Sequence, residues 1–86
     1  MFYVYIIRSN KDYDLYTGST NDLRRRLAEH NKGNVFSTKY RTPFELIYYE
    51  AYKSEKDARN RERNLKLRAN ALNQLKRRIK ESLDSD

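Results

Sequence analysis

The amino-acid sequence predicts a single α+β domain in which a three-stranded, mostly antiparallel sheet is flanked by helices. The chain has 86 residues, which suffices for one compact domain but not for two. With 37% hydrophobic residues gathered in runs, it is too apolar for a disordered tail. The runs follow the order ββαβαα without an internal repeat or a linker. Residues 1–86 are therefore expected to form one domain.

The first two elements are expected to form a β-hairpin. The run Phe2–Arg8 carries aromatic or β-branched residues on both faces of the expected strand. This is typical of a strand buried on both sides. The polar stretch 9–12 should turn, and a short second strand follows around Tyr13–Thr17. Gly18 is expected to end that strand, where it permits backbone angles or a close approach that a side chain would block.

A first helix and a long loop come next. Thr20 or Asn21 can cap a helix that runs to about Lys32, and Gly33 is expected to stop it. Residues 34–43 form a polar, basic loop that contains the only proline of the chain.

The remaining residues predict a third strand and two helices. Phe44–Tyr52 is rich in aromatic and apolar residues and reads as a strand. Ser54 can cap a second helix that runs to about Arg68, and Asp57 stands at its N3 position as in a capping-box variant. A further helix is expected over residues 70–83, with leucine and isoleucine side chains on one face.

The charge of the chain favours a polyanionic partner. Lys and Arg number 19 against 12 Asp and Glu, which gives a formal net charge of +7. Nucleic acid is the usual polyanion and an anionic membrane surface the weaker alternative, although a basic surface can also serve solubility alone. Because cysteine is absent, disulfides and Cys-ligated zinc are excluded. The N-terminal apolar run is too short for a membrane span and lacks signal-peptide features, so a cytoplasmic location is expected.

Two polar residues of the first helix fall on its apolar side. Leu23 and Leu27 define the inward stripe, His30 falls on that stripe and Arg26 lies at its edge. The other two arginines of the run 24–26 point outward. The geometry thus singles out one arginine and the only histidine, although a lone histidine is more typical of a hydrogen-bonded rim residue than of a catalyst.

The second helix repeats this pattern with a carboxylate. Ala58 and Leu65 define its inward stripe, and Glu62 lies between them. A carboxylate there must be paired, hydrated in a cleft or bound to a cation, because an isolated buried charge is costly. An ion pair with Arg26 or Arg61 and a functional site are both compatible with the pattern.

Five of the eight tyrosines fall into two groups. Tyr48, Tyr49 and Tyr52 are interpreted as ordinary core or hairpin residues, since tyrosine favours half-buried strands. Tyr5 and Tyr16 are expected to face each other across the first hairpin, near the inner face of the first helix.

These residues resemble the motif of the GIY-YIG nuclease superfamily. Tyr3–Tyr5 and, ten residues later, Tyr16–Gly18 resemble its two signature tripeptides. Arg26 and His30 stand where the family carries an arginine and often a histidine, and Glu62 stands where it carries a metal-ligating glutamate. The resemblance implies the GIY-YIG fold and extends over nearly the whole chain.

Within the superfamily, the chain looks most similar to small stand-alone bacterial proteins related to the N-terminal domain of the excinuclease ABC C subunit. It departs from the motif at Tyr3, where the family has glycine, and at Thr17, where it has isoleucine; both departures preserve the tyrosines. An asparagine of the family site has three candidates here, Asn64, Asn70 and Asn73.

The resemblance implies a metal-dependent phosphodiester hydrolase. Glu62 would hold one Mg²⁺ or Mn²⁺ ion, and Arg26 would stabilise the more negative transition state. Tyr5 is the candidate general base, Tyr16 would orient water or phosphate, and His30 could relay the proton. The residue types alone leave open which of Tyr5, Tyr16 and His30 takes that proton.

Two functions are compatible with this set. The first is an endonuclease of the DNA-repair type, directed by the structure of its substrate and acting on DNA rather than RNA. The second is a nucleic-acid-binding module without catalysis, or a nuclease that needs a partner protein for targeting. In either case, basic residues are expected to grip the nucleic-acid backbone without reading bases. They are Lys39, Arg41, Arg59, Arg61 and Arg63.

Overall fold

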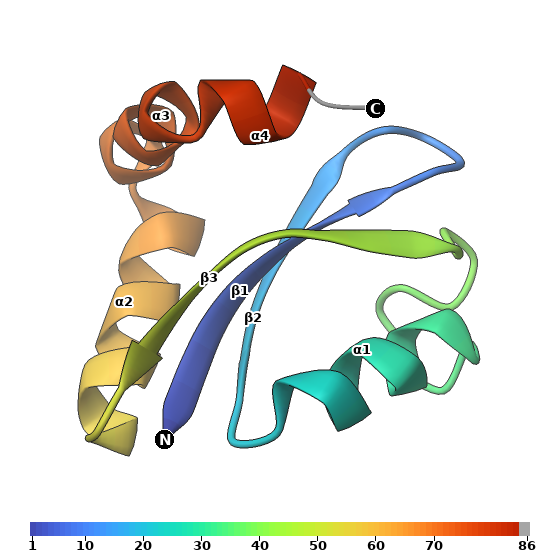
Figure 1. The fold of residues 1–86 in the computed structure, drawn as a ribbon, viewed down its shortest axis with the longest axis horizontal. Helices are drawn as coiled ribbons and strands as arrows, with labels where there is room; N and C mark the ends of the chain where they lie inside the picture. Colours follow the sequence, from blue (N-terminus) through green and yellow to red (C-terminus); the bar gives the residue numbers. More distant parts are fainter. Residues whose placement is uncertain (85–86) are drawn as a thin grey trace.

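The computed structural model, which describes residues 1–84, contains one three-stranded antiparallel sheet (Figure 1). Its strands are β1 (Phe2–Ser9), β2 (Leu15–Thr20) and β3 (Phe44–Tyr52), and their order in the sheet is β2-β1-β3. Both pairings of the central strand β1 are antiparallel. The predicted fold class and the first hairpin are therefore confirmed.

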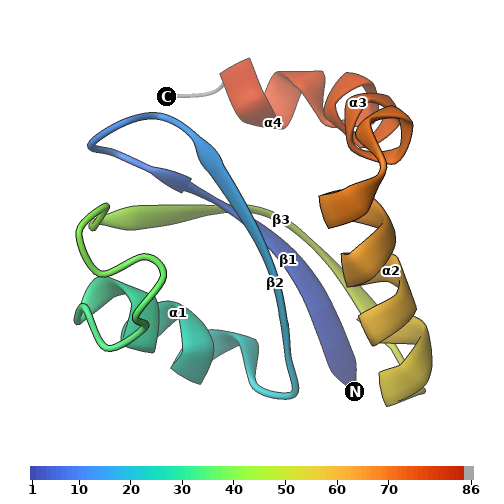
Figure 2. The ribbon, with the colours of Figure 1, turned by 180° about the vertical axis from the view of Figure 1, so that it is seen from behind.

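Helices cover both faces of the sheet. They are α1 (Leu23–Asn31), α2 (Glu55–Leu67), α3 (Ala69–Arg78) and α4 (Lys80–Asp84). Figures 1 and 2 show α1 on one side of the sheet and the other three helices on the opposite side. Within residues 1–84, none of these helices has the length and apolar character that crossing a membrane requires.

The central strand divides the interior into two cores, because successive side chains of a strand point to opposite faces. One core lies between β1 and the helices α2 and α3. Its buried residues are Val4, Ile6, Ala58, Leu65, Leu75 and Ile79. The other core contains Tyr5, Ile7 and Phe44, with Leu23 and Leu27 of α1 packed against it. The prediction that β1 is buried on both faces is confirmed.

The register of the hairpin corrects three details of the prediction. Gly18 pairs with Tyr5 inside β2 and does not end that strand. The strand begins at Leu15, because Tyr13 has a φ of 63° and belongs to the turn. Tyr16 pairs with Ile7, so it lies on the same face as Tyr5 but diagonally from it, not directly opposite.

The start of α1 also differs from the prediction. Because β2 continues through Thr20, the N-cap is Asp22, whose carboxylate accepts a hydrogen bond of 3.1 Å from the Arg25 backbone N–H. Thr20 and Asn21 were the predicted caps. At the other end, Gly33 follows the helix with a φ of 75°, which confirms its predicted role as the stop.

The C-terminal helices differ from the prediction at one residue. Ser54 caps α2 and accepts the Asp57 backbone N–H, as expected. The single helix expected over 70–83 is broken at Ile79, whose φ of −108° and ψ of 26° are not helical. Ile79, at the break, and Leu83, in α4, both pack against the core on the α2 side of the sheet.

Candidate active site

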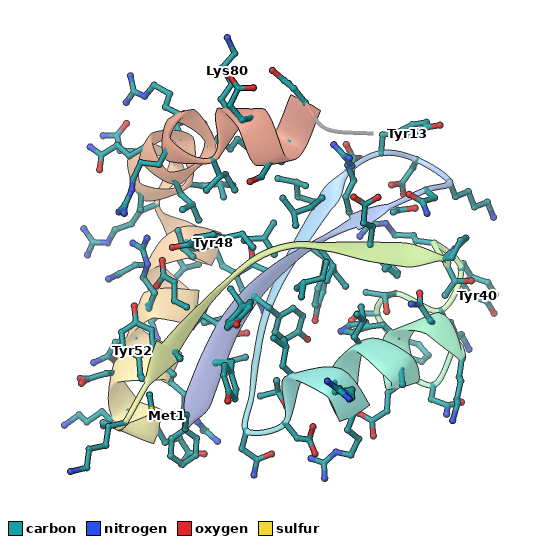
Figure 3. All side chains as sticks on the ribbon, viewed as in Figure 1. Met1, Tyr13, Tyr40, Tyr48, Tyr52 and Lys80 are labelled. Atoms are coloured by element: carbon teal, nitrogen blue, oxygen red, sulfur yellow. The ribbon has the colours of Figure 1, made fainter. Side chains whose placement is uncertain are left out.

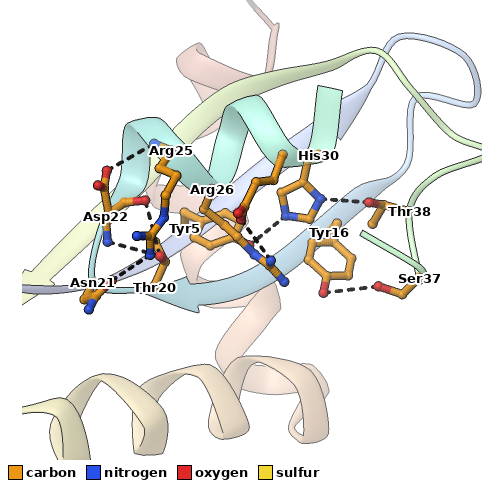
Figure 4. Close-up of polar contacts among 11 residues, drawn as sticks. Tyr5, Tyr16, Thr20, Asn21, Asp22, Arg25, Arg26, His30, Ser37 and Thr38 are labelled. Atoms are coloured by element: carbon orange, nitrogen blue, oxygen red, sulfur yellow. Dashed lines mark hydrogen bonds and ion pairs between the residues drawn. The ribbon is translucent and has the colours of Figure 1, made fainter. Parts of the chain in front are cut away.

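Four of the predicted site residues gather on the α1 face of the sheet (Figure 4). Tyr5 comes from β1, Tyr16 from β2, and Arg26 and His30 from α1. The spacing of four residues brings Arg26 and His30 to the same side of α1, toward the strands. The predicted inward orientation of Arg26 and His30 is therefore confirmed. Arg24 and Arg25 are exposed, but Arg25, predicted to point outward, lines the same groove as Arg26.

His30 links the strand cluster to the loop that follows α1. Its side chain is fully buried. Its Nε2 lies 2.8 Å from the Tyr5 hydroxyl, and its Nδ1 lies 2.7 Å from Thr38 Oγ1. One ring nitrogen donates and the other accepts, so the two hydroxyl groups and the imidazole form a continuous hydrogen-bonded chain. Thr38 was not predicted as part of the site, because a threonine in a polar loop carries no periodic signal.

Burial keeps both members of the central pair uncharged at neutral pH. It lowers the pKa of His30 to about 4, and the positive charge of Arg26 acts in the same direction. Burial also raises the pKa of Tyr5 to about 12, although hydrogen bonding with Arg26 opposes this rise. Tyr5 is thus a weaker candidate for the general base than the motif implied.

We expect the His30 imidazole to remain neutral from about pH 8 down to about pH 5. Because the chain contains one histidine, a single set of ring C–H resonances in an NMR titration reports it without ambiguity. The unfolded chain takes up a proton near pH 6.5, whereas the folded protein does so only near pH 4. The contribution of the neutral His30 to the free energy of unfolding is therefore fully present above pH 6.5, and it falls by roughly 3 kcal/mol as the pH drops from 6.5 to 4. A ring titration centred near 6.5 would contradict the prediction.

Arg26 remains a fixed cation at the edge of the cluster. Its Nη1 lies 3.2 Å from Glu29 Oε1. Burial opposes its charge, but hydrogen bonds with Tyr5 and Glu29 outweigh burial and raise the pKa of Arg26 further. Its side chain keeps 37% of its surface exposed, so it can meet an anion from solvent.

Arg26 lines a groove between α1 and α2 that crosses the end of β2. The groove has a volume of about 380 Å³ and is lined by polar side chains from the β2–α1 junction and both helices. An adjoining hollow of about 370 Å³ contains Glu62, Arg63 and Lys66. Ser19 and Arg59 line both spaces, so Arg26 and Glu62 approach the same edge strand from opposite sides of the sheet.

Glu62 has different partners from those expected. Its Oε1 accepts a hydrogen bond of 2.7 Å from Ser19 Oγ, and its Oε2 lies 2.9 Å from Lys66 Nζ. The expected ion pairs with Arg26 and Arg61 are both wrong, because Arg26 pairs with Glu29 and Arg61 reaches β3. The Lys66 pair could have been predicted, since residues i and i+4 are neighbours on a helix.

The surroundings of Glu62 fit one hard divalent cation. The carboxylate is 21% exposed and faces the hollow. Within residues 1–84, no three histidine, cysteine or acidic side chains form a ligand cluster, so Glu62 would be accompanied by water and substrate oxygens. Mg²⁺ accepts such a sphere of one carboxylate, waters and phosphate. A bound cation would compete with Lys66 for the carboxylate.

The residues predicted to grip nucleic acid occupy three different places. Arg59 and Arg63 line the hollow beside Glu62. Arg61 instead pairs with Glu50 at 3.0 Å over β3, the opposite edge of the sheet, so its predicted contact with nucleic acid is not supported. Arg41 pairs with Asp12 at 2.7 Å, and Lys39 lies in the loop after α1.

Glu50, the partner of Arg61, also binds two of the tyrosines interpreted as core residues. Glu50 accepts hydrogen bonds from Tyr48 at 2.7 Å and from Tyr52, on the α2 side of the sheet (Figure 3). Tyr49 is 52% exposed and packs edge-on against Tyr3. Asn64, Asn70 and Asn73 are exposed on α2 and α3.

The fold and this residue set correspond to a known family of catalytic domains. Residues 1–77 match the family described as the GIY-YIG catalytic domain. The chain belongs to this family, which is a family of nucleases.

Within the family, the chain belongs with the UPF0213 proteins. It is 42% identical over 67 residues to UPF0213 protein CPE1444 of Clostridium perfringens, covering 77% of this chain and 71% of that protein. It is 43% identical over 67 residues to UPF0213 protein SpyM50708 of Streptococcus pyogenes, covering 77% and 72%. It is also similar to the solution NMR structure of UPF0213 protein BH0048 from Bacillus halodurans, with a TM-score of 0.54 and 36% identity over 87% of this chain and 82% of that one.

Proposed function

We propose that this protein is a metal-dependent endonuclease that hydrolyses phosphodiester bonds, in DNA rather than RNA, and recognises the structure of its substrate rather than a base sequence. One observation carries the proposal: Arg26 and Glu62 flank the edge strand β2 from opposite sides, in adjoining hollows that share Ser19 and Arg59. A cation and a carboxylate so placed are what a phosphate and a divalent metal require.

Arg26 is proposed to bind the scissile phosphate. Its planar guanidinium can donate two parallel hydrogen bonds to phosphate oxygens. The charge on these oxygens grows as water attacks, so a cation that is already in place stabilises the transition state more than the ground state. Arg59 and Arg63 would contact neighbouring phosphates and leave the bases unread.

Glu62 is proposed to hold one Mg²⁺ or Mn²⁺ ion, with Ser19 orienting the carboxylate through its 2.7 Å hydrogen bond. Such an ion, when bound, supplies Lewis-acid neutralisation of the phosphate and of the leaving oxygen. Lys66 Nζ lies 2.9 Å from Glu62 Oε2. We expect Lys66 to move toward the phosphates once the Glu62 carboxylate binds the metal.

Tyr16, as the tyrosinate, is proposed to receive the proton of the attacking water and to become a neutral phenol. Tyr5 is 2% exposed, bonded to His30, and its pKa of about 12 opposes ionisation. Tyr16 lies closer to the open edge, with its ring 5.5 Å from the Lys66 ammonium. We therefore expect Tyr16→Phe to remove cleavage and Tyr5→Phe to retain part of it, measured as single-turnover rates. The reverse order would assign the proton to Tyr5.

Cleavage of a panel of labelled nucleic acids tests the proposed function. The panel contains nicked, flapped, branched and single-stranded DNA and a structured RNA, each with Mg²⁺ or Mn²⁺. Glu62→Ala should abolish cleavage and leave DNA affinity equal or higher, because it removes one negative charge. Asp57→Ala is the matched control: it removes the same charge from the same helix, at an exposed residue that lines neither hollow, and should cleave normally.

Two other outcomes would contradict the proposal. Cleavage that survives in Glu62→Ala would show that Glu62 holds no required metal. Salt-dependent binding of nucleic acid without cleavage, by the wild type and by both variants, would favour a binding module, or a nuclease that a partner protein must activate. A DNA-repair role and a cytoplasmic location remain part of the proposal, and cleavage of a branched, flapped or nicked DNA in the panel would support the repair role.

A further inference from the structure

The loop between α1 and β3 exposes two aromatic rings around one ammonium group. Phe36 is 84% exposed and Tyr40 is 76% exposed. Lys39 Nζ lies 4.9 Å from the centroid of the Phe36 ring and 5.0 Å from that of the Tyr40 ring. These three side chains form one exposed surface, which we call the aromatic platform. Single exposed apolar side chains are ordinary, but two large rings grouped around a cation call for an explanation.

The backbone that carries the platform is held in place. Val35 and Thr38 are buried, and the Thr38 N–H donates to the Val35 carbonyl at 3.1 Å. The Arg41 N–H donates to the Thr38 carbonyl at 2.9 Å, and Ser9 Oγ donates to the Arg41 carbonyl at 2.5 Å. The rings are therefore presented to solvent by a loop that the buried Val35 and Thr38 side chains and these hydrogen bonds hold in place.

The same loop also contacts the candidate active site. Thr38 Oγ1 lies 2.7 Å from His30 Nδ1, and Ser37 Oγ lies 3.5 Å from the Tyr16 hydroxyl. Ser37 and Thr38 stand between Phe36 and Tyr40 in the sequence. A ligand on the aromatic platform would thus lie next to Ser37 and Tyr16, at the loop side of the candidate active site.

We propose that the aromatic platform stacks on unpaired bases of the substrate strand. This inference rests on the proposed function and narrows its substrate class to nucleic acid with a single-stranded segment beside the scissile bond. Bases inside a duplex already stack on one another, so only unpaired bases offer free faces to Phe36 and Tyr40. Lys39 between the rings would meet the phosphate of the same strand, in keeping with the net charge of +7.

Binding without cleavage tests the platform independently of catalysis. Fluorescence anisotropy is measured in EDTA with a labelled single-stranded DNA, the same sequence as a duplex, and a single-stranded RNA. The Phe36→Ala/Tyr40→Ala variant should bind single strands with an affinity about tenfold or more below that of wild type. Its affinity for the duplex should stay within about twofold of wild type. Phe36→Trp should retain single-strand affinity, because indole also stacks. Binding should quench the fluorescence of a 2-aminopurine base placed in the single strand, because the base stacks on the rings. This quenching should be lost in the double alanine variant and retained in the other variants.

The matched control is Tyr13→Asn, which removes a ring that is 72% exposed at the hairpin turn, away from Tyr40 (Figure 3). Asparagine tolerates the φ of 63° at this position. The control should bind single strands like wild type, and circular dichroism should show all variants folded.

Three results would overturn the inference: an unchanged single-strand affinity in the double alanine variant, an equal loss on the duplex, or sedimentation showing that the rings instead join two copies of the chain. Platform-dependent single-strand binding by a protein that cuts nothing would support the inference and refute the proposed function. Cleavage without any dependence on the rings would do the opposite. Equal losses for DNA and RNA would support stacking without a sugar preference.

Discussion

Replacing Arg26 with alanine is expected to lower the single-turnover rate of phosphodiester cleavage by about a hundredfold or more. Arg26 lines the groove, and its raised pKa keeps it cationic throughout the accessible pH range. Removing it takes away the proposed phosphate donor. It also removes the positive charge that lowers the pKa of Tyr5 and helps to keep His30 neutral. Arg26→Lys should restore only part of the rate, because an ammonium cannot donate two parallel hydrogen bonds to a phosphate.

Arg24→Ala provides the matched control for this experiment. It removes the same charge from the same helix, but Arg24 is exposed on the side of α1 that faces away from Tyr5. This variant should bind nucleic acid slightly more weakly, with a salt dependence reduced by about one phosphate contact, and should cleave bound substrate at the wild-type rate. Equal losses of rate in the two variants would contradict the assignment of Arg26, since they would indicate a general effect of charge.

Replacing Gly18 with alanine is expected to disable the site from within the sheet. A Cβ added at Gly18 would lie 2.5 Å from Tyr5 Cζ and closer still to the Tyr5 hydroxyl. Tyr5 is 2% exposed and bonded to His30, so its ring cannot turn aside without breaking that bond. We expect a loss of about 1–3 kcal/mol in urea unfolding, the usual cost of overpacking. The His30 ring resonances should shift, and cleavage should fall more than the loss of folded protein explains.

Gly33→Ala is the control for the stability component. Gly33 has a φ of 75°, so alanine there strains the backbone and should cost about 1 kcal/mol. The nearest atoms to an added Cβ lie 4.0 Å away, and Tyr5 is not among them. The folded fraction of this variant should retain wild-type cleavage and unchanged His30 resonances. Normal cleavage by Gly18→Ala would show that the position of Tyr5 is not critical.

Much of the architecture follows from local patterns. The run Phe2–Arg8 carries apolar residues on both faces, and it became the central strand with a core on each side. The spacing of Leu23, Leu27 and His30 placed the histidine on the buried face of α1, because helical periodicity depends on the backbone alone. Ser54 and Gly33 marked helix ends through side-chain and backbone chemistry that acts within a few residues.

The errors lie where contacts between distant segments decide the outcome. Gly18 looked like a strand end, but Tyr5, thirteen residues away, occupies the space where its side chain would be. The final helix breaks at Ile79, and the apolar spacing does not reveal the break, because Ile79 and Leu83 would share one face of an unbroken helix as well. Arg61 was expected to contact nucleic acid like Arg59 and Arg63, but it pairs with Glu50 of β3. Helical periodicity does not reveal where β3 lies relative to α2.

The sequence by itself determined the class of the fold, the order of its elements, and which arginine and histidine of α1 turn inward, since all of these depend on short-range periodicity. Only the tertiary structure decided the partners of the charged and polar groups. Lys66 and Ser19 hold Glu62, Thr38 and Tyr5 hold His30, and Glu50 takes Arg61. Hydrogen bonds and ion pairs act over about 3 Å, so which groups meet depends on how the strands and helices pack.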